Sequence, residues 1–124
     1  MTASGEAREE NQAATADGAT FETVATTDEL PEGTLLAART ASGDEVCLFN
    51  YRGQVGAVRN VCTHAEFPLS DGTLDRDGTI ECVWHGARFF CLTGEVRRGP
   101  AVDPVATYEV RVVDSQIQVR GRRS

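Results

Sequence analysis

The chain has 124 residues, which is enough for one domain with its own hydrophobic core and too few for two. Its formal net charge of −7 makes nucleic acids and anionic membrane surfaces poor partners. No apolar stretch approaches the length that spans a bilayer, and the amino terminus has neither the basic start nor the apolar centre of a secretory signal. We therefore expect a cytoplasmic protein with reduced thiols, and a monomer.

Residues 1–20 predict a disordered tail, because Met1 is their only apolar side chain larger than alanine and they cannot bury enough surface to offset ordering. We expect the folded domain to span residues 21–121. From Phe21 the chain consists of short apolar runs separated by turn residues. The expected strands are, in chain order, 21–25, 34–40, 45–52, 54–61, 79–83, 87–92, 94–99, 106–113 and 116–119.

The last two runs show the clearest period of two. Tyr108, Val110 and Val112 alternate with charged residues and predict a strand with one buried face. Asp114-Ser115 predicts the turn of a hairpin whose second arm carries Ile117 and Val119. No long amphipathic helix and no internal repeat is evident, so the fold class is all-β, an antiparallel sandwich or small barrel.

The two histidines of the chain each stand close to a cysteine. Cys62 and His64 form a C-x-H pair after one expected strand, and Cys82 and His85 form a C-x-x-H pair between two others. The intervening residues, 65–81, contain two Asp-Gly turn signals, which suits an excursion that returns the chain and places the two loops side by side. Gly86 allows a tight turn beside the second pair.

Two thiolates and two imidazoles can hold either zinc or a two-iron cluster. Structural zinc sites usually pair like with like, as C-x₂₋₄-C and H-x₃₋₅-H, whereas both pairs are mixed here. A [2Fe–2S] cluster can take both cysteines on one iron and both histidines on the other. The mixed spacing therefore favours one [2Fe–2S] cluster, and a zinc-stabilised structural module is the alternative.

The segments CTHAEFPLSDG, CVWHGARF, TGEV and GPAVDP resemble the Rieske ferredoxins of bacterial ring-hydroxylating dioxygenase systems, which serve the breakdown of aromatic compounds. The resemblance covers residues 21–120. It implies a Rieske fold, with a small cluster-binding lobe of two ligand loops on an antiparallel β scaffold. The implied ligands of the Rieske-type cluster are Cys62, His64, Cys82 and His85. It also implies that residues 99–104 form a proline-containing loop that shields the cluster.

The same resemblance implies a low reduction potential. High-potential relatives carry a disulfide between the two ligand loops and two hydroxyl donors after the second histidine. This chain has Phe67 and Trp84 at the disulfide positions, and Ala87 and Phe89 at the hydroxyl positions. We therefore expect a potential near the low end of the range of roughly −150 to +300 mV for Rieske centres.

Several other residues have simple interpretations. Cys47 and Cys91 are expected to be small buried hydrophobic residues, with a disulfide between them as the less favoured alternative. Trp84 is expected to pack near the ligands. Four acidic residues between the loops are expected to form a solvated stretch that could steer a basic partner, namely Asp71, Asp75, Asp77 and Glu81.

The expected function is one-electron transfer from an NAD(P)H-dependent flavin reductase to a Rieske non-haem iron oxygenase. The alternative is the small subunit of an NAD(P)H-dependent nitrite reductase; Gly86, which those relatives often lack, favours the ferredoxin. The chain is not expected to be the oxygenase itself, because catalytic iron needs two further histidines and a carboxylate. It also lacks a nucleotide-binding G-x-G-x-x-G pattern after a strand. No catalytic residue is therefore predicted.

Overall fold

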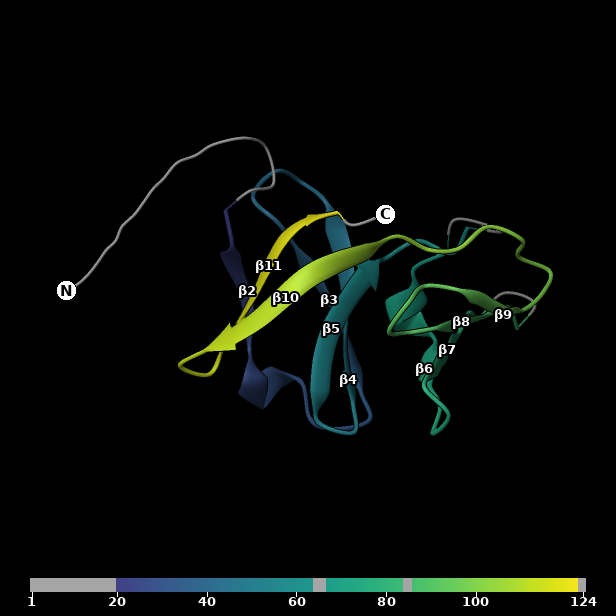
Figure 1. Ribbon diagram of the computed structural model, residues 1–124, viewed down its shortest axis with the longest axis horizontal. Coiled ribbons are helices and arrows are strands. Elements are labelled where there is room, and N and C mark those ends of the chain that lie inside the picture. The colour runs from purple at the N-terminus through teal and green to yellow at the C-terminus, as the bar shows by residue number, and fades with distance from the viewer. Residues whose placement is uncertain (1–19, 64–66, 84–85, 123–124) are drawn as a thin grey trace.

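A computed structural model describes residues 20–63, 67–83 and 86–122 of the chain. It contains two antiparallel sheets (Figure 1). The larger sheet has the order β2-β11-β10-β5-β4-β3, with strands β2 (Glu22–Thr26), β3 (Leu35–Arg39), β4 (Glu45–Tyr51), β5 (Gln54–Arg59), β10 (Thr107–Val113) and β11 (Gln116–Arg122). The smaller sheet has the order β6-β7-β8-β9, with strands β6 (Thr73–Leu74), β7 (Thr79–Glu81), β8 (Arg88–Phe90) and β9 (Val96–Arg98). The all-β prediction is confirmed.

The larger sheet curls toward closure. Its edge strands β2 and β3 approach one another, and the Glu22 carboxylate accepts a hydrogen bond from the Ala41 N–H at 2.9 Å, just beyond β3. Ala25, Leu48 and Ile117 belong to the apolar core inside this curl. Phe21, at the start of the predicted domain, lies between the guanidinium groups of Arg111 and Arg120, whose carbons are 4.2 and 4.4 Å from the ring centroid.

The smaller sheet is an insertion in the larger one. Strands β5 and β10 are paired neighbours, and the residues between them, 60–106, form a separate lobe to one side (Figure 1). The short helices η1 (Thr27–Glu29) and η2 (Leu69–Asp71) are the only helices in the described ranges. A second apolar core lies where this lobe meets the larger sheet, and it includes Phe49, Leu69, Ile80 and Phe89.

The carboxy-terminal hairpin has the predicted turn. Asp114 and Ser115 both have positive φ, at 51° and 65°, which is typical of a two-residue turn between twisted strands. Burial along β10 falls from Tyr108, 7% exposed, to Val112, 46% exposed. The prediction of one continuous buried face was wrong at Val112, because β5 pairs with β10 only at Thr107 and Tyr108 and the hairpin then extends beyond it.

Candidate metal centre

Each of the two motif cysteines begins a short loop. One backbone hydrogen bond of the same type closes each loop. The Cys62 N–H donates to the carbonyl of Phe67 at 2.8 Å, and the Cys82 N–H donates to the carbonyl of Ala87 at 2.8 Å. The acceptor lies five residues after the cysteine in both cases. We call residues 62–67 ligand loop 1 and residues 82–87 ligand loop 2. Their matching closure makes the two loops equivalent in backbone length, although the histidine positions within them differ.

Both motif cysteines are buried side chains of one core. Cys62 is 0% exposed and Cys82 is 1% exposed, and both belong to the core between the lobe and the larger sheet. His64 and His85 lie outside the described residues. In the described ranges no group of three or more metal-binding side chains occurs. The donor set fits a group that takes two thiolates and two imidazoles.

A buried asparagine, which the sequence did not single out, holds the ends of ligand loop 1 together. Asn60 is 3% exposed and precedes the loop. Its Nδ2 donates to Ser70 Oγ at 2.9 Å, and its Oδ1 accepts from the Ser70 N–H at 2.7 Å. The Asn60 N–H also donates to the carbonyl of Glu45 on β4 at 3.0 Å. Asn60 therefore connects β4, the start of ligand loop 1 and helix η2, and its side-chain oxygen and nitrogen both have hydrogen-bond partners.

Ligand loop 2 is the connection of the β7–β8 hairpin. Glu81 and Arg88 are directly paired across the two strands at the base of the loop. Gly86 has φ of 74°, so the expected tight turn next to His85 uses the left-handed conformation that glycine adopts without strain. An added Cβ at Gly86 would lie 3.3 Å from the Glu81 carboxylate, which shows how closely that side chain approaches the loop.

The prediction that the acidic stretch between the loops is solvated was wrong for two of its residues, which are bound to an arginine. Asp75 and Glu81 are both bound to Arg88 and are each about one-third exposed, at 34%. Asp77 accepts hydrogen bonds from the hydroxyl (2.7 Å) and the N–H (3.1 Å) of Thr79, and these bonds lower its pKa. Asp71 is exposed, as expected.

The segment 99–104 lies against ligand loop 1. Thr63, the residue after Cys62, donates from Oγ1 to the carbonyl of Asp103 at 2.7 Å. Ala101 is 4% exposed and belongs to the same core as Cys62, whereas Val102 points outward and is 84% exposed. This position next to the loop is the one that the resemblance implied for a shielding segment.

Cys47 and Cys91 are buried free thiols, as the sequence predicted, and no disulfide joins them. Burial raises the pKa of both from 9.0 to about 12. A thiol with this pKa stays protonated at neutral pH and is a poor metal ligand, since metals bind the thiolate. The candidates for the metal centre are Cys62 and Cys82, because these two cysteines carry the C-x-H and C-x-x-H spacing.

A profile of the Rieske [2Fe–2S] domain matches residues 20–109. The chain belongs to this family. The ferredoxin subunit of 3-phenylpropionate/cinnamic acid dioxygenase from Photorhabdus laumondii is 38% identical over 96 residues, or 77% of this chain and 90% of the relative. The Rieske fold and a single Rieske-type [2Fe–2S] cluster are thereby confirmed, as is the role of an electron carrier.

Solved structures agree with this assignment. The ferredoxin of carbazole 1,9a-dioxygenase from Nocardioides aromaticivorans IC177 is 37% identical, with a TM-score of 0.75 over 82% of this chain and 97% of that chain. A chain from a complex of reduced oxygenase and oxidised ferredoxin in carbazole 1,9a-dioxygenase is 28% identical, with a TM-score of 0.77 over 84% of this chain and 95% of that chain. The whole length of such ferredoxins is therefore matched.

Proposed function

We propose that this Rieske protein carries single electrons from an NAD(P)H-dependent flavoprotein reductase to the terminal component of a Rieske non-haem iron oxygenase. The observation that carries the proposal is the pair of equivalent loops, each of which places a buried cysteine in the same core. The oxygenase as acceptor is supported by the relatives, which are named as ferredoxins of dioxygenases. We propose residues 21–121 as the limits of the domain.

We propose Cys62, His64, Cys82 and His85 as the ligands of the cluster, with the cysteines on one iron and the histidines on the other. When bound, the cluster supplies a centre that takes up and releases one electron. The surrounding residues exclude water from the thiolates, hold both loops closed and tie ligand loop 1 to residues 99–104. Two thiolates neutralise the oxidised cluster, whereas four would leave it with a charge of −2; the neutral centre accepts an electron more readily.

The surface around the two loops suits contact with a protein partner. Phe67 in ligand loop 1 is 37% exposed, Val83 in ligand loop 2 is 55% exposed, and Val102 in the segment beside them is 84% exposed. Large apolar side chains that stay exposed are typical of a contact surface. We propose that the reductase and the oxygenase meet the protein here in turn, because an electron crosses fastest where the cluster lies close to the surface.

We propose a cytoplasmic location. It is supported by Cys47, Cys62 and Cys91, which are free thiols, as is typical of a reducing compartment. No helix in the described ranges is long and apolar enough to cross a membrane.

The proposal is tested on purified full-length protein. We expect two irons and two acid-labile sulfides per chain, and an electron paramagnetic resonance signal with average g below 2 after reduction. His64→Ala and His85→Ala should each prevent stable assembly of the cluster. Stoichiometric zinc in a colourless protein would contradict the proposal, and full cluster content in either alanine variant would remove that histidine from the ligand set.

The electron acceptor is tested separately by co-purification and reconstitution. The protein should restore oxygenase turnover when mixed with NADH, a ferredoxin reductase and the terminal component of a Rieske oxygenase. Copurification with the large subunit of an NAD(P)H-dependent nitrite reductase, together with no oxygenase turnover, would instead support the alternative of a nitrite reductase small subunit.

A further inference from the structure

Arg88 connects three segments of the smaller sheet at the base of ligand loop 2. Its Nη2 donates to Glu81 Oε1 at 3.1 Å, across the last residue pair before the loop. Its Nη1 donates to Thr79 Oγ1 at 3.1 Å and is paired with the carboxylate of Asp75, which follows β6. The next pair along the hairpin is the one between the Cys82 N–H and the Ala87 carbonyl. One guanidinium group thus holds the segments from which ligand loop 2 projects.

This ion group differs from the exposed pairs of the protein. The Arg88 side chain is 25% exposed, whereas the arginines of the Arg39–Glu45 and Arg97–Glu95 pairs are 64% and 47% exposed. Exposed pairs contribute little, because water screens them and long side chains lose entropy. Arg88 is screened less and has several charge-assisted hydrogen bonds, which fix both its position and those of its partners.

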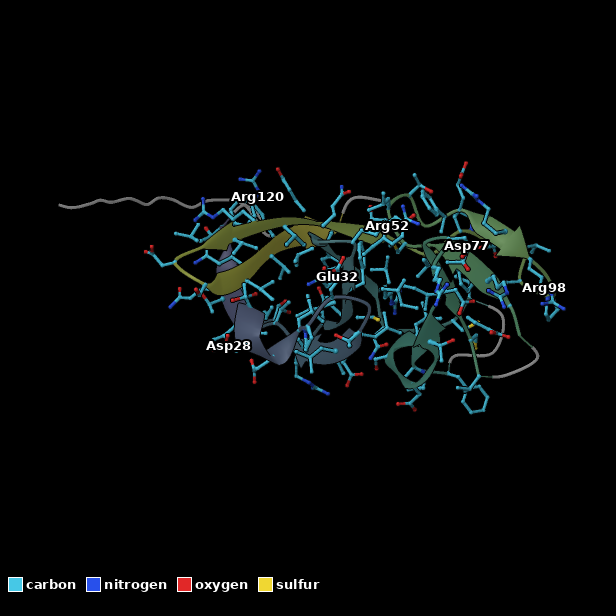
Figure 2. All side chains as sticks on the ribbon, turned by 90° about the horizontal axis from the view of Figure 1, so that it is seen from below. Asp28, Glu32, Arg52, Asp77, Arg98 and Arg120 are labelled. Atoms are coloured by element: carbon cyan, nitrogen blue, oxygen red, sulfur yellow. The ribbon has the colours of Figure 1, made fainter. Side chains whose placement is uncertain are left out.

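The charges on this side of the lobe are nearly balanced around Arg88. Asp75 and Glu81 bind it directly, and Asp77 is held nearby by Thr79. Arg98 stands opposite Arg88 on β9, and Figure 2 shows Asp77 and Arg98 in the part of the molecule remote from Asp28, with Arg98 nearer the tip. Without Arg88, the carboxylates of Asp75 and Glu81 would lose the counter-ion that they share. Glu81 directly precedes Cys82, so this loss of charge would occur next to a proposed ligand.

We infer that Arg88 is a positioning residue that also sets the reduction potential of the cluster, an inference that rests on the proposed ligands. Reduction adds one negative charge to the cluster. A fixed cation at the base of ligand loop 2 stabilises that charge, and a nearby carboxylate opposes it. Arg88 and Glu81 therefore act in opposite directions on the potential, although both are needed for the same hydrogen bond.

This opposition separates an electrostatic role from a merely structural one. Arg88→Gln and Glu81→Gln both break the bond between the two side chains, so a structural role alone would shift the potential in the same direction in both variants. In contrast, the inferred role predicts a lower potential for Arg88→Gln and a higher one for Glu81→Gln. Arg88→Lys keeps the charge and should stay near the wild type.

The test is protein-film voltammetry of cluster-loaded, full-length proteins at one pH and low ionic strength. At a fixed electrode potential, Arg88→Gln should lower the ratio of reduced to oxidised protein about threefold, and Glu81→Gln should raise it by a similar factor, as for one partly screened unit charge. Both shifts should shrink at high salt. Arg39→Gln, which breaks an exposed pair on the larger sheet, is the matched control and should leave the ratio unchanged.

Unchanged ratios, or shifts of the same sign in Arg88→Gln and Glu81→Gln, would overturn the inference. If Arg88→Gln does not retain its cluster, Glu81→Gln and Asp75→Asn decide, since both remove a negative charge and must raise the ratio. A lowered or unchanged ratio in these two variants would also overturn it. Absence of a cluster from the wild type would instead refute the proposed function, so the two failures are distinguishable.

Discussion

Ala87→Ser tests whether a missing hydroxyl donor keeps the potential of this protein low. Ala87 is 0% exposed, belongs to the same core as Cys62 and Cys82, and closes ligand loop 2 through its carbonyl. The substitution adds one oxygen at the base of the loop without changing the backbone. Phe89→Tyr adds a hydroxyl at the second position where high-potential relatives carry one, again on a fully buried side chain.

The size of the effect follows from the hydrogen bond. Reduction places additional negative charge on the cluster sulfurs, so a donated hydrogen bond stabilises the reduced state more than the oxidised state. A hydrogen bond to a charged group contributes about 1.5–3 kcal/mol in total. If the difference between the two states is about half of this, about 0.75–1.5 kcal/mol, it corresponds to about 30–65 mV, since about 59 mV equals about 1.4 kcal/mol for one electron. Each variant should therefore raise the potential by tens of millivolts, and the double variant by more.

Protein-film voltammetry on the wild type and the three variants at one pH measures this shift. Ala57→Ser is the matched control, because Ala57 is 2% exposed but lies in the core inside the larger sheet. There the hydroxyl should cost about 1–3 kcal/mol of stability if it finds no partner, and the potential should stay unchanged. Wild-type potentials in Ala87→Ser and Phe89→Tyr, with crystal structures showing both hydroxyls within hydrogen-bonding distance of cluster sulfur, would refute the reasoning.

Two predictions concern stability. Gly94→Ala should lower the free energy of unfolding by about 3 kcal/mol or more, because φ is +81° and an added Cβ would lie 2.1 Å from the Val105 carbonyl oxygen. Gly53→Ala, with φ of +89° and no atom within 4 Å, should cost only about 1 kcal/mol, and equal losses in urea denaturation would contradict the steric argument. The pKa of Cys47 and Cys91 rises from 9.0 to about 12 on folding, so stability should be full below pH 9 and fall toward pH 12, by up to about 1.4 kcal/mol per pH unit for each thiol. Replacing both cysteines by alanine should remove this slope in urea denaturation between pH 8 and 10.5, and an unchanged slope would show that other groups cause it.

The spacing of cysteine and histidine in the sequence was enough to predict the cluster, and the alternation of apolar residues was enough to predict most strands. Both signals are local. Period-two patterning reports which side of a strand is buried, and the Asp114-Ser115 turn depends only on the conformational preferences of adjacent residues. The short strand β6 was missed, because two residues are too few to show a period.

The residues that support the ligand loops depend on the tertiary structure. Asn60 and Ser70 are ten residues apart, and Thr63 and Asp103 are forty apart. No local pattern relates such residues, since their contact follows from the insertion of the whole lobe between β5 and β10.

The role of Arg88 was hidden for a related reason. The sequence shows only scattered charges, and whether a charge is solvated or bound depends on which strands are neighbours. The sequence by itself therefore determined the class of the fold and the type of cluster. The tertiary structure decided which charges and hydrogen bonds surround the two motif cysteines, because electrostatic and hydrogen-bonding energies depend on distances through space that packing alone establishes.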